Sequence, residues 1–136
     1  MQKSVGFILR RCLALLLLTS LFVVANAQAS EGGGGGGAYE KLEPFTVNLV
    51  DAGKVIQVVL TLKLAKPESG EKVKLFMPVI RHEMILLLSG KTSAQLESSA
   101  GKQRLIVETK AVANKAIELS PKEGVSDVLL ESIIIQ

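Results

Sequence analysis

The sequence predicts a small α+β fold, in which an antiparallel sheet packs against two to three helices. Three observations support this prediction. Apolar residues alternate with polar ones over residues 42–64, which is the two-residue period of half-buried strands. Apolar residues recur at helical spacing over residues 71–92 and again over residues 99–117. The last strand-forming run, residues 125–135, then adds a C-terminal strand to the β-hairpin.

The first 27 residues are expected to form a targeting segment. They begin with three basic side chains and no acidic one: Lys3, Arg10 and Arg11. The apolar run Cys12–Ala25 follows, and Ala25-Asn26-Ala27 is a small-x-small cleavage site, so the order is that of a secretory signal peptide. The run is short for a membrane span, which needs about 20 residues. Cleavage following Ala27 would release a soluble periplasmic protein, and an uncut N-terminal membrane anchor is the alternative.

The charge of the chain belongs to this segment. Its three basic residues account for the whole formal net charge of +3, so the rest of the chain is neutral. A nucleic-acid partner is therefore not expected, because that function needs a basic patch on the folded domain. The single cysteine, Cys12, also lies in this segment, so a mature protein would offer no thiol, disulfide or cysteine metal site.

Residues 28–38 read as a Gly-rich flexible linker. Its glycines, Gly32–Gly37, lose much backbone entropy on ordering and favour a flexible tether. A tether is most useful when the segment before it stays in a membrane, which favours the anchor. The folded domain is then expected over residues 39–136.

The hairpin is expected from two strands and a turn. Leu42–Val50 is the first strand, with Pro44 near its start, where the missing amide proton does least harm. Asp51-Ala52-Gly53 provides turn residues. Val55–Leu64 is the second strand and carries one continuous apolar face.

A long helix is expected over Glu71–Thr92, kinked or restarted at Pro78. One apolar stripe should close the core: Val73, Phe76, Met77, Ile80, Met84, Leu87 and Leu88. A second line lies nearly opposite and should meet either a later helix or another chain: Leu75, Val79, His82 and Leu86.

The sequence Gly90-Lys91-Thr92 is expected to stop this helix, although it is similar to the end of a phosphate-binding loop. That loop needs a glycine where this chain has Ile85, and it follows a strand rather than a helix. Thr92 and Gln95 then form a capping box for a short helix.

A further helix is expected from Ser99 or Gly101 to about Ile117. The loop Ser120–Gly124 follows, and Val125–Ile135 is the last strand. The end of this strand is apolar on both faces, so it is either central in the sheet or paired at an edge with another molecule.

No catalytic, cofactor or metal site is expected. His82 is the only histidine, and no acidic residues are spaced to complete a metal-binding triad with it. Ser98 and Ser99 lie in no Gly-x-Ser-x-Gly nucleophile elbow and are better explained as helix caps. The carboxylates are scattered, with no pair placed for acid–base work.

Four blocks of the chain resemble the flagellar basal-body-associated FliL family over about Tyr39–Gln136. They are Leu42–Leu49 with the Ile56-Gln57-Val58 strand, Met77–Arg81 running through Ile85–Ser89 to Lys91-Thr92, Gly101-Lys102 with Leu105, and the strand ending in Ile135-Gln136. Their order and spacing carry the resemblance. In place of His82, the family usually has an acidic residue.

The resemblance implies a non-enzymatic, single-span inner-membrane protein of the flagellar basal body. Its periplasmic domain would be similar to the stomatin/prohibitin module and would assemble into homo-oligomeric rings. The implied partners are the stator proteins MotA and MotB, and the implied role is support of flagellar rotation in motility and chemotaxis. The alternative is a soluble periplasmic FliL-like binding or scaffold module without a flagellar partner.

Six residues are the candidates for a self-association or partner surface. They come from the second line of the long helix and from the bifacial end of the last strand: Leu75, Val79, His82, Leu86, Ile133 and Ile135.

Overall fold

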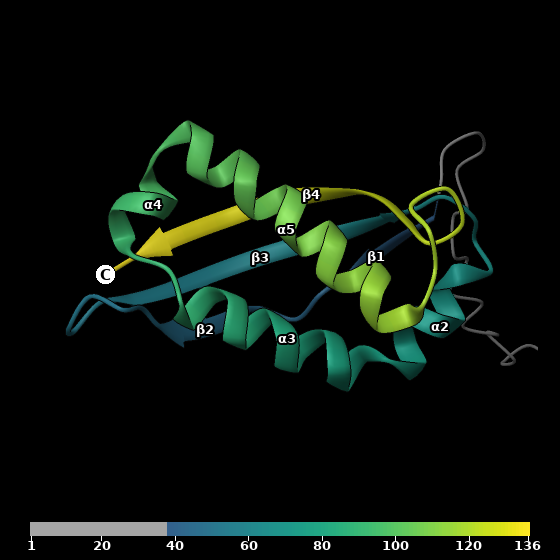
Figure 1. The fold of residues 1–136 in the computed structure, drawn as a ribbon, viewed down its shortest axis with the longest axis horizontal. Coiled ribbons are helices and arrows are strands. Elements are labelled where there is room, and N and C mark those ends of the chain that lie inside the picture. Colours follow the sequence, from purple (N-terminus) through teal and green to yellow (C-terminus); the bar gives the residue numbers. More distant parts are fainter. Residues whose placement is uncertain (1–37) are drawn as a thin grey trace, which may run out of the picture. The chain divides into compact units, whose positions relative to one another are not determined.

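A computed structural model describes residues 38–136. The predicted signal peptide or anchor and residues 28–37 of the predicted linker lie outside the described residues. The described elements, in chain order, are β1 (Tyr39–Lys41), β2 (Phe45–Asn48), β3 (Val55–Leu64), α2 (Ser69–Leu75), α3 (Met77–Ser89), α4 (Ser93–Glu97), α5 (Ser99–Ile117) and β4 (Val125–Ile135). They form one antiparallel sheet with helices on one face, so the predicted α+β class is confirmed (Figure 1).

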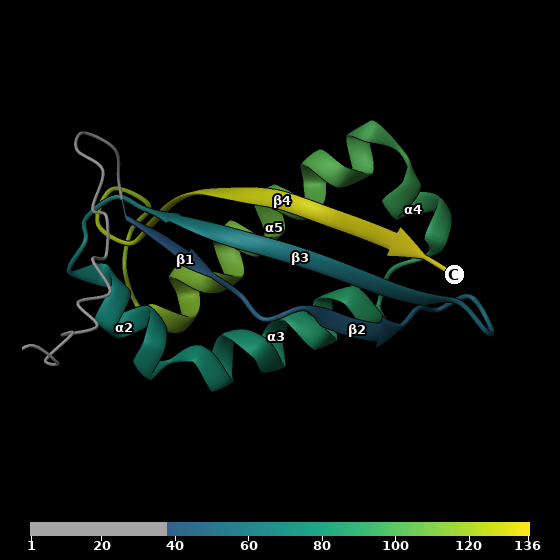
Figure 2. The same cartoon turned by 180° about the vertical axis from the view of Figure 1, so that it is seen from behind.

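The long strand β3 lies at the centre of the sheet (Figure 2). β1 and β2 follow one another along one side of β3, with Lys41 opposite Thr61 and Phe45 opposite Val58. β4 pairs along the other side of β3, where Ile56 lies opposite Ile135. The predicted hairpin and the bounds of β3 and β4 are confirmed, and within residues 38–136 β4 is an edge strand.

The predicted first strand was too long. Only Phe45–Asn48 of the predicted Leu42–Val50 forms a strand, β2, and the preceding strand β1 was not predicted. Leu42, Glu43 and Pro44 separate β1 from β2. Leu42 remains tied to β3 by a main-chain hydrogen bond from its N–H to the Leu60 carbonyl oxygen, at 3.0 Å. Pro44 has no N–H to continue the ladder, so regular pairing resumes only at Phe45.

The helix predicted over Glu71–Thr92 is restarted rather than kinked, and it forms two helices, α2 and α3. Phe76 leaves helical geometry between them, at φ −95° and ψ 10°. Pro78 then lies in the first turn of α3, which is the restart that the sequence left open. Proline suits this turn because it has no N–H to donate to the preceding turn. This break brings the described helices to four, where two to three were expected.

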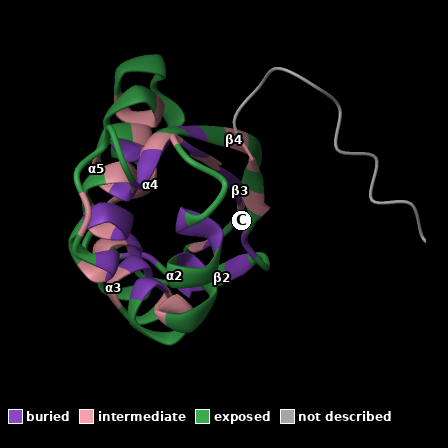
Figure 3. Cartoon of the chain, turned by 90° about the vertical axis from the view of Figure 1, so that its right-hand side faces the viewer, coloured by how far each residue is buried: buried purple, intermediate pink, exposed green. Residues whose placement is uncertain are grey.

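The helices bury the predicted core stripe against the sheet (Figure 3). α3 packs over β2, and α5 packs over β4. The stripe contributes four side chains with no exposed surface: Val73, Ile80, Met84 and Leu88. The opposite face of the sheet is left without a helix in the described part of the chain (Figure 2).

The turn between α3 and α4 is fastened to the hairpin. Gly90 ends α3, and the Thr92–Gln95 capping box predicted for the short helix is confirmed. The Ser93 N–H donates to Asp51 Oδ2 at 2.6 Å. The Ser93 side chain first, and this N–H second, lower the pKa of the Asp51 carboxyl. Because Asp51 comes from the β2–β3 turn, the bond fixes where α4 starts.

Candidate interaction surface

The predicted second line of the long helix lies exposed. Val79, His82 and Leu86 follow one another on the solvent side of α3, with Val79 44% and Leu86 55% exposed. Leu75 is 74% exposed but lies on α2, before the break at Phe76. We use the name α3 surface for the exposed side chains Val79, His82, Ile85 and Leu86.

Ile85 was missed by the sequence interpretation. It is 44% exposed and lies three residues after His82, which places both on the same side of the helix. The spacing from His82 was the signal that could have found it. Its place inside a continuous apolar run obscured that signal, because every residue from Met84 to Leu88 is apolar and only some of them face the core.

Ile133 and Ile135 are not part of the α3 surface. Both side chains are half-buried on the helical side of β4, where they pack against the core. The neighbour between them, Ile134, faces the open side of the sheet and is 45% exposed. Because α3 packs over β2 and β4 lies beyond β3, the six predicted residues fall into two separate places.

Arg81 holds α3 to the segment between β1 and β2. Its guanidinium carbon lies 4.7 Å from the centre of the Phe45 ring, a cation–π distance. Its Nη1 donates to the Glu43 carbonyl oxygen at 3.2 Å and lies 3.9 Å from Glu43 Oε2. The first two blocks of the resemblance therefore meet in space, and their contact sets the position of α3 and its exposed side.

The partly buried ion pair Lys91–Glu108 connects the α3–α4 turn to α5. Lys91 Nζ lies 2.6 Å from Glu108 Oε2, and the two side chains are only 16% and 33% exposed. The middle residue of the Gly-Lys-Thr sequence therefore has a structural contact within the domain.

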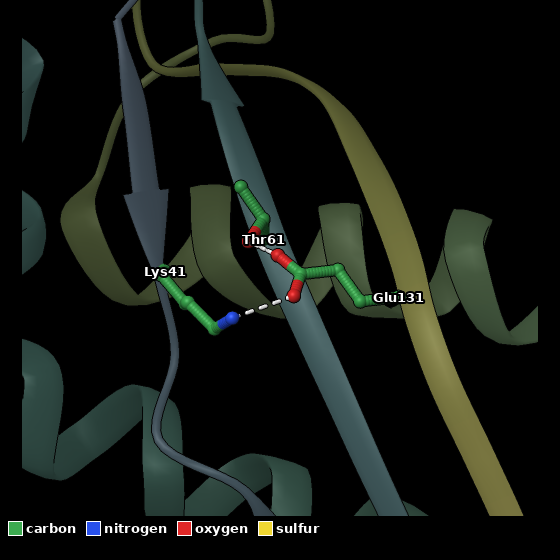
Figure 4. A network of polar contacts seen from close by, with 3 residues as sticks. All are labelled: Lys41, Thr61 and Glu131. Carbon is green, nitrogen blue, oxygen red and sulfur yellow. Dashed lines mark hydrogen bonds and ion pairs between the residues drawn. The ribbon is translucent and has the colours of Figure 1, made fainter.

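The open face of the sheet carries a polar network that spans three strands (Figure 4). Glu131 of β4 accepts a hydrogen bond from the Thr61 hydroxyl of β3 and lies 2.7 Å from Lys41 Nζ of β1. These donors, Lys41 first and Thr61 second, hold the pKa of the Glu131 carboxyl below its usual range. Glu131 is the extra residue at the register shift between Val59 and Leu60, so a β-bulge turns it over the neighbouring strands.

Replacing Lys41 with methionine should raise the pKa of Glu131 towards that of an ordinary glutamate. A carboxylate that loses a charged donor is more easily protonated. Since the folded-state pKa is depressed, the contribution of this network is present above the unfolded-state pKa. It is lost as the pH falls through the folded-state pKa. An NMR titration of the Glu131 side chain measures the shift.

The matched control is Lys63→Met on the same face of β3. Lys63 lies opposite Asp127 and Tyr39 rather than Glu131, so its removal should leave the Glu131 titration in place. An unchanged midpoint in Lys41→Met would show that the Lys41 contact does not stabilise the carboxylate.

Two further findings concern chemistry and membranes. Over residues 38–136, no three His, Cys, Asp or Glu side chains are grouped as a metal site would require. In the same part of the chain, no helix has the length and apolar character to cross a membrane.

Comparison with known proteins identifies the family. A family model described as "Flagellar basal body-associated protein FliL" matches residues 39–136. "Flagellar protein FliL" of Escherichia coli K12 is 30% identical over 115 residues, which cover 84% of this chain and 75% of the relative. "Flagellar protein FliL" of Aquifex aeolicus is 29% identical over 100 residues, which cover 72% of this chain and 60% of the relative. The chain belongs to the flagellar basal body-associated FliL family.

Proposed function

We propose that this chain is a non-enzymatic accessory protein of the flagellar motor, which supports stator function and rotation by binding other proteins through the α3 surface. The observation that carries the proposal is the exposed apolar line on α3 within a domain of the FliL family. Val79, Ile85 and Leu86 are each at least 44% exposed and do not belong to the stripe of α3 that packs in the core. Apolar side chains grouped on an exposed surface mark a site of interaction.

The structure supports a contact role because it presents this line on a rigid support. Ile80, Met84 and Leu88 of the α3 core stripe are fully buried. Arg81 fixes the helix to Phe45 and Glu43. Binding to a preorganised surface avoids the entropic cost of ordering it. Exposed aliphatic side chains around His82 fit a protein partner, either a second copy of this chain or a stator subunit.

The proposal includes a location and partners. The domain would lie on the periplasmic side of the inner membrane, held by an N-terminal anchor through the Gly-rich tether. It would assemble with its own copies and contact MotA and MotB, thereby acting in motility and chemotaxis. The soluble periplasmic module without a flagellar partner is the alternative.

Two single variants test the α3 surface, Val79→Glu and Leu86→Lys. Their charges agree with the dipole of α3, so both should fold. A charge placed at the centre of an apolar interface costs about 2 kcal/mol or more, which weakens binding at least about 30-fold. We expect both variants to lose swarming and high-load swimming when they replace the chromosomal copy.

Val107→Glu is the matched control. Val107 is also 55% exposed, but it lies on α5 rather than α3. It should swarm normally and be present at the same level. Normal swarming of a deletion strain would contradict the motor function and favour the soluble module. Normal swarming of the two α3 variants alone would contradict only the assigned surface.

A further inference from the structure

The free edge of β4 offers main-chain hydrogen-bonding groups. Val55 and Gln136 exchange two hydrogen bonds, from Val55 N–H to the Gln136 oxygen at 2.9 Å and from Gln136 N–H to the Val55 oxygen at 3.0 Å. In an antiparallel ladder every second pair is bonded in this way. Ile134 opposite Gln57 is the next such pair, so the N–H and C=O groups of Ile133 and Ile135 point away from β3.

The end of this edge also lacks the features that normally prevent strand pairing. Natural sheets protect an edge with charged side chains, prolines or bulges. β4 has Asp127 and the bulge at Glu131 in its first part. Ser132–Ile135 has no charge, no proline and no register shift. Within residues 38–136 no strand pairs with this side of β4.

A hollow lies beside this edge on the helical side of the sheet. Its volume is about 200 Å³, and it is lined by Leu96 and Glu97 of α4, Lys102 of α5, and Ile133 and Ile135 of β4. The turn that joins α4 to α5 extends past the edge of β4 in two perpendicular views (Figures 1 and 3). The lining therefore combines three aliphatic side chains with one acidic and one basic side chain.

We propose that an extended segment of another protein adds to β4 as an antiparallel strand at Ile133 and Ile135. The partner residue opposite Ile133 would exchange two main-chain hydrogen bonds with it. Directly opposite residues point to the same face of a sheet, so its side chain enters the hollow beside Leu96. An uncharged aliphatic residue fits there, because Ser132–Ile135 is uncharged and the charges of Glu97 and Lys102 offset one another.

Two other occupants fit less well. A second copy paired antiparallel would bring its own α4–α5 turn to the same side of the joined sheets, where the two turns would crowd one another. The N-terminal part of the same chain enters at Ala38, whose carbonyl oxygen accepts from the Leu64 N–H at 2.8 Å. Ala38 therefore lies at the Leu64 end of β3, whereas Ile135 lies opposite Ile56 near the other end, roughly 26 Å away at strand spacing. The adjoining Gly32–Gly37 also has no side chain that could fill the hollow.

This proposal is separate from the function assigned to the α3 surface, because the two surfaces lie on different edges of the domain. The test uses the purified full chain and a library of displayed seven-residue peptides. We expect selected peptides to share one aliphatic position, and to slow amide exchange of Ile133 and Ile135 at least about tenfold while Ile134, already bonded to β3, changes little.

Ile135→Pro and Ile135→Val form the matched pair of variants. Proline removes an N–H that points away from β3, whereas valine keeps it. The selected peptides should bind Ile135→Val normally and Ile135→Pro about tenfold more weakly. If the proline variant fails to fold, the amide-exchange measurement on the unsubstituted chain still tests whether a peptide pairs with β4.

Three results would overturn the proposal. One is a library that yields no peptide protecting Ile133. Another is protection of Ile133 in the chain alone that grows with protein concentration, which assigns the edge to a second copy. The last is protection in the chain alone that does not depend on concentration, which assigns the edge to its own N-terminal segment.

Discussion

Replacing Gly101 with alanine is expected to destabilise the domain by about 3 kcal/mol. A Cβ at this position would lie 2.7 Å from the Gln95 carbonyl carbon and 2.9 Å from Ser98 Oγ, and closer still to the Gln95 carbonyl oxygen. Real Cβ contacts are essentially never under 3.0 Å, and the two nearest of these atoms belong to the Gln95 main chain. The α4–α5 turn must therefore move, because main-chain atoms cannot rotate away as the Ser98 side chain can.

Thermal unfolding followed by circular dichroism measures this loss, which should lower Tm by roughly 12–24 °C for a domain of this size. Gly90→Ala is the matched control. A Cβ there meets nothing nearer than 3.6 Å, and its φ of −87° suits any residue. Its Tm should stay within a few degrees. A Gly101→Ala protein as stable as Gly90→Ala would show that the turn is not packed as closely as described.

Most of the fold could be predicted because the sequence repeats its signal over many residues. β3, β4 and α5 each have ten or more residues, and the apolar periods of β3 and α5 agree with their burial. The capping box was predicted for a different reason, since Thr92 and Gln95 are the residue types that this local geometry needs.

The breaks in the elements could not be placed from the sequence with the same precision. Pro44 and Pro78 both indicated a disturbance, but proline does not determine whether an element shortens, bends or divides. At Phe76 the chain leaves helical geometry, and α2 and α3 point in different directions (Figure 1). At Leu42 the side chain is fully buried, so the core holds a residue that is in neither β1 nor β2.

The exposure of the six candidate residues could be predicted only in part. Residues that share one side of a helix can be identified from the helical period of the sequence, and Val79, His82 and Leu86 do share an exposed side of α3. An apolar run in a strand does not reveal which face lies under a helix. Ile133 and Ile135 were grouped with the helix line, yet they face α4, and only their outward main-chain groups are free for a partner.

The buried contact of Asn114 could not be predicted from the apolar period of α5, because Asn114 is a polar residue among the core positions of that helix. Its amide donates to the Val125 carbonyl oxygen at 2.9 Å and accepts from the Val125 N–H at 2.8 Å. Both residues are buried, so one side chain satisfies both main-chain groups of the first residue of β4. Gly124 has no Cβ at the place where that side chain lies.

Replacing Asn114 with alanine should therefore cost about 3 kcal/mol, because it leaves a buried N–H and a buried C=O without partners. Urea unfolding at pH 7 measures this change, and Asn48→Ala, an exposed asparagine on β2, is the matched control with an expected change below about 0.5 kcal/mol. Equal stability of the two alanine variants would mean that water or a local shift replaces both bonds.

Asn114→Asp separates the two hydrogen bonds from simple loss of volume. An ionised carboxylate can accept from the Val125 N–H but opposes the Val125 oxygen, whereas a protonated carboxyl can serve both groups. Burial and that oxygen should raise its folded-state pKa above the unfolded value of about 3.9. Its stabilising effect is then present below about pH 4 and is lost as the pH rises through the folded-state pKa. The gap between Asn114→Asp and the unsubstituted protein should thus widen from pH 4 to pH 7, while the gap for Asn114→Ala should not change, because alanine has no proton to lose.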